Sequence, residues 1–212
     1  MRLLTLVLAL WSPLTALADT KPATLSDIQD PALRTCVQQA LGAGQTLASL
    51  TQLKCHNMGI ESVAGLETLT GLRKLSLFRN RIRHISVPLP ATLESLNLAR
   101  NRLDTLTLAD LPQLRELFVF GNRLTRLELR QLPHLTALRA NDNRLTRFEY
   151  QALAQLEKLY LFNNKLDTVD IYHLPAMRYM DCRQNPMPDA LYDEMDRLEH
   201  VTFLHDGNAE DW

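Results

Sequence analysis

The sequence predicts an α/β-type solenoid in which short parallel strands stack into one curved sheet. Two observations support this prediction. Apolar residues begin equivalent units at Leu50, Leu72, Leu93, Leu114, Leu135, Leu156, Met177 and Leu198, so the first interval is 22 residues and every later one is 21. Asparagine recurs at one place in six of these units, at Asn80, Asn101, Asn122, Asn143, Asn164 and Asn185. A fixed period of this length is the signature of a repeat architecture.

Each unit follows the pattern L-x-x-L-x-L-x-x-N-x-L, the leucine-rich repeat pattern, as in Leu114, Leu117, Val119, Asn122 and Leu124. The alternation in L-x-L points the leucines inward and the intervening residues outward, as in a strand. One unit cannot bury its own apolar edge, so the units stack and their strands form a parallel sheet on the concave face. We expect the asparagine amide to bond backbone groups that the turn after the strand leaves unpaired.

The second half of four units also alternates, with the apolar pairs Leu106 and Leu108, Leu127 and Leu129, Phe148 and Tyr150, and Val169 and Ile171. This alternation predicts short extended or irregular segments on the convex face. A full helix is not expected there, because a unit of 21 residues leaves little room for one.

Residues 1–18 have the layout of a secretory signal peptide. Arg2 precedes an apolar stretch, and small residues at Ala16 and Ala18 predict cleavage near Ala18. The apolar stretch is shorter than the roughly 20 residues that a membrane span needs, and no longer one follows. We therefore expect an exported protein, periplasmic or secreted, with no membrane span.

Residues 19–49 are predicted to form a helical N-terminal cap. Asp30 and Pro31 are a favourable helix start, and Gly42 is a favourable end. One face of this helix carries Leu33, Cys36, Val37, Ala40 and Leu41. We expect that face to cover the first repeat, in which Cys55 takes an inward position. This placement predicts a Cys36–Cys55 disulfide, and the alternative is that both cysteines pack as small hydrophobic residues.

Residues 50–197 comprise seven repeat units, and residues 198–212 form a degenerate last rung with the C-terminal cap. Cys182 takes the inward position of the seventh unit, which predicts a buried and unreactive thiol. A short helix is expected over residues 189–197.

With these motifs the chain resembles bacterial leucine-rich repeat proteins, and among them the internalin-like group. The stretch LASLTQLKCHNMGIESVAGLETLTGL looks like the internalin type of N-terminal cap. The resemblance covers essentially all of the chain after the predicted signal peptide. The resemblance implies the fold and is only weakly specific for function. The function is therefore inferred from the surface of the sheet.

The outward strand positions form columns about 4.8 Å apart on the concave face. The predicted partner-binding residues on these columns are Phe78, Phe118, Phe120, Arg139, Tyr160, Phe162 and Tyr179. Six aromatic rings facing solvent are unfavourable, and clusters of this kind are typical binding hot spots. The alternative is that the rings cover each other in a cross-strand ladder that contributes only to stability, and both can hold at once.

A basic rim follows the asparagine column, at Arg81, Arg102, Arg123, Arg144 and Lys165. We interpret it as a docking rim for an acidic partner or for a phosphorylated or sulfated glycan. The alternative is a solvated, partly salt-bridged edge. An acidic column at Glu128, Glu149 and Asp170 is expected on the other side of the coil.

The composition indicates a binding protein rather than an enzyme. With 23 basic and 24 acidic residues, the chain has no overall attraction to nucleic acid. No catalytic motif is present, the histidines lack zinc-ligand spacing, and we expect neither a metal nor a cofactor. The first prediction is recognition of a protein partner, host or cell-envelope, by a monomer. The alternatives are a glycan-binding module and a cell-envelope structural or assembly factor with its aromatic face covered by its own oligomer.

Overall fold

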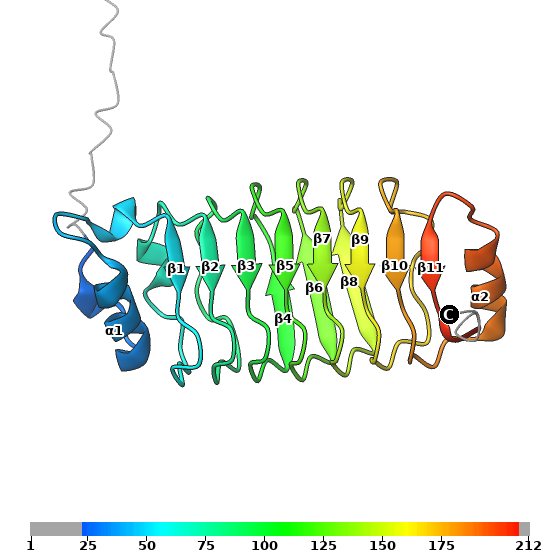
Figure 1. Ribbon diagram of the computed structural model, residues 1–212, viewed down its shortest axis with the longest axis horizontal. Coiled ribbons are helices and arrows are strands. Elements are labelled where there is room, and N and C mark those ends of the chain that lie inside the picture. Colours follow the sequence, from blue (N-terminus) through cyan, green and yellow to red (C-terminus); the bar gives the residue numbers. More distant parts are fainter. Residues whose placement is uncertain (1–22, 208–212) are drawn as a thin grey trace, which may run out of the picture.

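The computed structural model describes residues 23–207 and shows one solenoid with a cap at each end (Figure 1). The predicted signal peptide lies outside the described residues. Eight parallel strands form one sheet, in the order β1 (Gln52–Lys54), β2 (Lys74–Ser76), β3 (Ser95–Asn97), β5 (Glu116–Phe118), β7 (Ala137–Arg139), β9 (Lys158–Tyr160), β10 (Tyr179–Asp181) and β11 (Thr202–Leu204). The predicted repeat solenoid with a parallel sheet is confirmed.

The strands pair in the register that the repeat predicts from β1 to β10. The middle residue of each strand pairs with the middle residue of the next, as in Leu96 with Leu117 and Leu117 with Leu138. These three leucines are completely buried, whereas the residues on either side of them point outward. The core is therefore a stack of leucine layers between the sheet and the opposite face of the coil.

The opposite face carries a second parallel sheet of three strands, β4 (Thr105–Leu108), β6 (Arg126–Arg130) and β8 (Arg147–Gln151). The predicted extended segments are thus confirmed for three units. In the next unit Val169 and Ile171 are buried but belong to no strand.

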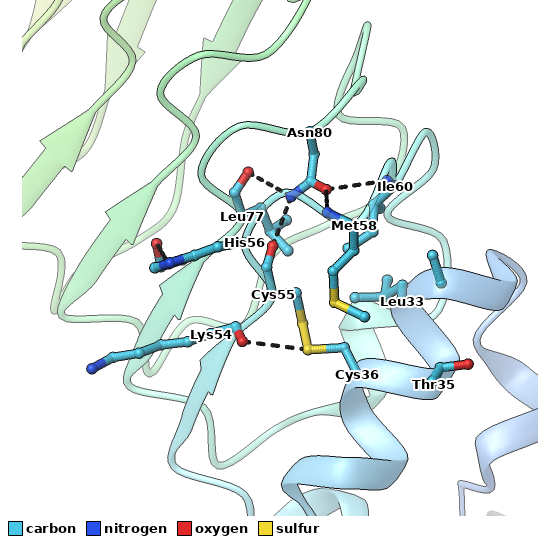
Figure 2. Close-up of a disulfide and its surroundings, with 12 residues drawn as sticks. Leu33, Thr35, Cys36, Lys54, Cys55, His56, Met58, Ile60, Leu77 and Asn80 are labelled. Carbon is cyan, nitrogen blue, oxygen red and sulfur yellow. Dashed lines mark hydrogen bonds between the residues drawn. A yellow bond between two sulfur atoms is a disulfide. The ribbon is translucent and has the colours of Figure 1, made fainter.

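The asparagine column bonds one rung to the next. Asn80 donates from Nδ2 to the carbonyl oxygens of Cys55 and Leu77 at 2.7 and 2.9 Å, and its Oδ1 accepts from the backbone N–H groups of Met58 and Ile60 (Figure 2). The later members donate to a carbonyl oxygen of the preceding rung in the same way, and the Oδ1 of each accepts from one backbone N–H group of that rung; they are Asn101, Asn122, Asn143, Asn164 and Asn185. The predicted structural role of this column is confirmed.

The N-terminal cap is built on α1 (Pro31–Ala40), with short 3-10 turns at Leu25–Asp27, Leu47–Ser49 and Leu66–Thr68. The Asp30 side chain accepts hydrogen bonds from the backbone N–H groups of Ala32 and Leu33, as predicted for a helix start. Leu33, Cys36 and Val37 are buried against the first rung. Ala40, which was expected on the same face, is the last residue of the helix and is exposed.

The Cys36–Cys55 disulfide joins α1 to the first rung, with a Cα–Cα distance of 5.8 Å (Figure 2). The prediction of this bond is confirmed. The bond holds α1 over the apolar end of the solenoid, which would otherwise face solvent.

The C-terminal cap consists of α2 (Asp189–Asp196) and β11. Met180 of β10 pairs with Phe203, 23 residues further along, so the last rung begins two residues later than the 21-residue period predicts. The helix explains the difference, because its return path occupies more residues than the extended segments of the inner rungs. As a result His205, and not a leucine, takes the inward position and is completely buried.

Candidate functional site

The outward side of the eight-stranded sheet, here called the sheet face, corresponds to the predicted concave surface. The strand register aligns its central row, which runs Lys54, Ser76, Asn97, Phe118, Arg139, Tyr160 and Asp181. Backbone hydrogen bonds continue the ladder two residues further and align a neighbouring row of His56, Phe78, Ala99, Phe120, Asn141, Phe162 and Arg183. The columns expected from the sequence are therefore present in the structure.

The central row contains a chain of contacts around one arginine. The Arg139 guanidinium lies 5.8 Å from the centroid of the Phe118 ring and 4.9 Å from that of Tyr160. The Tyr160 ring in turn lies 5.2 Å from the ring of Tyr179. Three rings and a cation, contributed by four adjacent strands, thus form one group.

The neighbouring row holds a second group. The Phe78 and Phe120 rings lie 6.4 Å apart, on either side of the rung that carries the completely buried Ala99. His56 packs edge-on against Phe78 with centroids 5.8 Å apart. The small residue between the two phenylalanines allows their rings to meet, because a larger side chain would keep them apart.

All six predicted aromatic side chains are half-buried rather than fully exposed. The rings cover part of one another, as the stabilising interpretation expected, and each also leaves part of its surface open. The structure brings the predicted residues together on one face. Partner binding by them remains a prediction.

Several hollows open on the sheet face, and two of them lie over its central row. A hollow of about 240 Å³ is lined by Phe120, Arg139, Asn141, Tyr160 and Phe162. A smaller one of about 160 Å³ lies over β1 to β3, where Ser76, Ser95 and Asn97 are small and Phe118 forms a wall. Both hollows are open to solvent, so the face can receive a protruding group but cannot enclose a small substrate.

Burial and charge perturb two groups beside the aromatic row. Burial raises the pKa of the Tyr179 hydroxyl, and the nearby Asp181 carboxylate raises it further. Asp181 is 3% exposed and forms an ion pair with Arg183 at 2.7 Å. The hydrogen bond with Asp181 raises the pKa of the Arg183 guanidinium. The Asp181 and Arg183 charges therefore neutralise one another at the end of the central row.

Most of the predicted basic rim has no ion-pair partner. Arg81 lies 3.9 Å from Glu61, whereas Arg102, Arg123, Arg144 and Lys165 form no ion pair with a carboxylate of residues 23–207. The acids on the far side of the coil have other partners: Glu128 and Glu149 pair with Arg126, Arg130 and Arg147. The rim is therefore a largely unneutralised cationic edge.

The predicted partner-binding set omitted two residues that contact Phe78, His56 and Arg100. Arg79, Arg100 and Gly121 directly precede the asparagine and have φ of 59°, 54° and 66°, in the left-handed region. From this turn the Arg100 guanidinium lies 5.8 Å from the centroid of the Phe78 ring. The residue directly before each asparagine was the sequence signal that could have identified Arg100.

Within residues 23–207, no group of three or more His, Cys, Asp or Glu side chains could hold a metal ion. In the same range no helix is long and apolar enough to cross a membrane. Cys182 is buried beneath α2, and burial raises the pKa of its thiol to about 12, which keeps it protonated at neutral pH.

Comparisons with known proteins agree with this architecture. The family model for leucine rich repeats matches residues 70–124. No curated protein sequence has significant similarity to the chain.

Solved structures give more extensive matches. The functional domain of InlJ from Listeria monocytogenes, described as including a cysteine ladder, is 23% identical over 85% of this chain and 55% of that chain, with a TM-score of 0.44. YopM from Yersinia enterocolitica is 25% identical over 74% of this chain and 36% of that chain, with a TM-score of 0.52. Internalin C2 from Listeria monocytogenes is 17% identical over 88% of this chain and 98% of that chain, with a TM-score of 0.52. The chain thus spans little more than half of the InlJ functional domain and about a third of the YopM chain. At 17% identity, the similarity to internalin C2 shows a shared fold alone.

Proposed function

Because the chain is a leucine-rich repeat protein with repeats of about 21 residues, we propose that it is an exported binding protein that recognises a protein partner through its sheet face. The observation that carries this proposal is the pair of half-buried aromatic groups on the sheet face, one around Arg139 over four adjacent strands and one formed by Phe78 and Phe120. Repeat solenoids use such extended surfaces for binding. Aromatic and arginine side chains dominate the energy of protein interfaces.

The disulfide supports an extracytoplasmic location. Structural disulfides persist in oxidising compartments and are rare in the cytosol. The Cys36–Cys55 bond therefore fits the proposal that the protein functions outside the cytoplasm, and the predicted signal peptide would direct it there.

The test uses a double variant on the sheet face. Phe120→Ser with Phe162→Ser removes two rings that line the same hollow, and Tyr172→Ser is the matched control. Tyr172 is 62% exposed and lies outside the eight strands of the sheet face. The three proteins are immobilised, and the proteins that each captures from envelope and host extracts are compared by mass spectrometry.

We expect the wild type and the Tyr172→Ser control to capture the same partner and the double variant to lose it, with circular dichroism showing all three folded. Equal capture by the double variant would refute the proposal. A self-covered oligomer would instead appear in sedimentation as a dimer or larger species that the double variant dissociates.

A glycan-binding module is the second candidate, because the aromatic hollow could stack on a sugar ring and the unpaired rim could hold sulfate or phosphate groups. A glycan array read at low and high salt tests it. Binding through the rim must weaken as salt rises, since exposed charges are screened.

A further inference from the structure

We infer that the hollow around Arg139 is a pocket for one carboxylate of the partner, an Asp or Glu side chain that docks on the guanidinium between aromatic walls. This inference rests on the proposed function, because it names the chemistry by which the same face would recognise its partner.

The guanidinium lies close to two rings and remains exposed. Phe118 lies on one side of the Arg139 side chain in the central row and Tyr160 on the other, at 5.8 and 4.9 Å from the guanidinium carbon to each ring centroid. A guanidinium in contact with aromatic rings can still donate hydrogen bonds along its edge. The two ring contacts restrict the Arg139 side chain and leave its donors accessible, so part of the entropy lost on binding is already lost in the free protein.

Nothing in the described chain uses these donors. Arg139 forms no ion pair with a carboxylate of residues 23–207 within 4.0 Å, and its guanidinium donates no side-chain hydrogen bond there. The acid of the same row, Asp181, is already engaged by Arg183 through two hydrogen bonds of 2.7 and 3.0 Å. A planar carboxylate matches the guanidinium fork and binds it through two parallel hydrogen bonds.

The walls of the hollow favour a single negative charge. Of its five lining residues only Arg139 is charged, and the others are Phe120, Tyr160, Phe162 and the buried Asn141. Arg139 is exposed and the hollow is open to solvent, so an incoming carboxylate can reach the guanidinium directly. One carboxylate balances one guanidinium, whereas the dianion of a phosphate ester would need a second cation. A protein side chain is therefore favoured over a phosphorylated group at this position.

The test selects random peptides displayed on phage against the immobilised full-length mature protein. Each enriched peptide is synthesised together with a partner peptide in which every Asp becomes Asn and every Glu becomes Gln, and the affinities are measured at physiological salt. The protein variants are Arg139→Gln, Arg139→Lys and Arg147→Gln. The last is the matched control, since it removes the same charge from an exposed side chain of β8, on the opposite sheet, and not from the sheet face or the basic rim.

We expect enriched peptides to contain an acidic residue whose amide replacement weakens binding at least about 10-fold, the order of one charge-assisted pair. Arg139→Gln should produce a similar loss, Arg139→Lys a smaller one, and Arg147→Gln little change. The Arg139→Gln loss should not add to the loss from the amide peptide, because both changes remove the same contact.

Three results would overturn the inference. Peptides whose binding depends on Phe120 and Phe162 but not on their own acids or on Arg139 would refute the carboxylate pocket and leave the proposed function standing. Failure to enrich any peptide that depends on the sheet face would count against both. Selective binding of sulfated glycans that is lost in Arg139→Gln would assign the hollow to a sugar-borne anion instead.

Discussion

Replacement of Asn122 by alanine tests how far the asparagine column holds the solenoid together. Asn122 lies in the middle of the repeats, where every neighbour is another complete rung, and it is 9% exposed. Its Nδ2 group donates to the carbonyl oxygens of Leu98 at 3.0 Å and of Val119 at 2.9 Å. Its Oδ1 accepts from the backbone N–H of Leu103 at 3.1 Å. Alanine would leave these three backbone groups without the asparagine's hydrogen bonds.

The expected loss follows from these three hydrogen bonds. Each contributes about 1 kcal/mol net, so Asn122→Ala should reduce the free energy of unfolding by about 3 kcal/mol. For a chain of this size that corresponds to a fall in Tm of roughly 6 to 12 °C. Asn122→Asp separates the effect of hydrogen bonding from that of side-chain volume. The aspartate keeps the size and the acceptor oxygen, but it places a carboxylate oxygen, in place of the donating NH2 group, against the carbonyl oxygens of Leu98 and Val119. It should destabilise the protein at least as much as alanine does.

Urea unfolding followed by circular dichroism, with the disulfide intact, measures the effect. The exposed Gln113→Ala, at the end of the preceding unit, is the control and should change stability by less than about 0.5 kcal/mol. A loss below about 1 kcal/mol for Asn122→Ala, or an unchanged Asn122→Asp, would show that the column contributes little and would refute this reasoning.

Three further predictions concern the caps and the thiol. Replacing Cys36 and Cys55 with serine opens a loop with a sequence separation of 19 residues, which should cost about 3 kcal/mol of unfolding free energy in a denaturant titration. An unchanged midpoint would contradict this. Burial alone raises the pKa of Asp30, but hydrogen bonds from four backbone N–H groups lower it overall. Its stabilisation should therefore be complete above about pH 4 and lost as pH falls further, so Asp30→Ala should flatten the acid limb of a stability–pH curve; an unaltered acid limb would argue against the cap. Cys182, with its pKa raised to about 12, should react with a thiol reagent at pH 8 only after unfolding in urea, and rapid labelling of the native protein would contradict its burial.

The predictable parts of this protein are those that repeat. Period, strand register and the asparagine bonds depend on contacts between equivalent residues of adjacent units, so one motif repeated in the sequence specifies all of them. The same local logic extended to the N-terminal cap, where Asp30 and the inward position of Cys55 indicated the helix start and the disulfide. The last rung broke the period, because α2 is not part of the repeat and its length moved the final strand by two residues.

The sequence by itself determined which residues share the sheet face, because alternation along a strand depends only on the local backbone. The tertiary structure alone decided how those residues meet. Phe78 and Phe120 contact each other because the intervening rung carries only Ala99, and Arg139 lies between Phe118 and Tyr160 because adjacent strands place them in one row. Such contacts depend on the size and conformation of side chains from different rungs. A pattern of residue types within one rung does not contain that information.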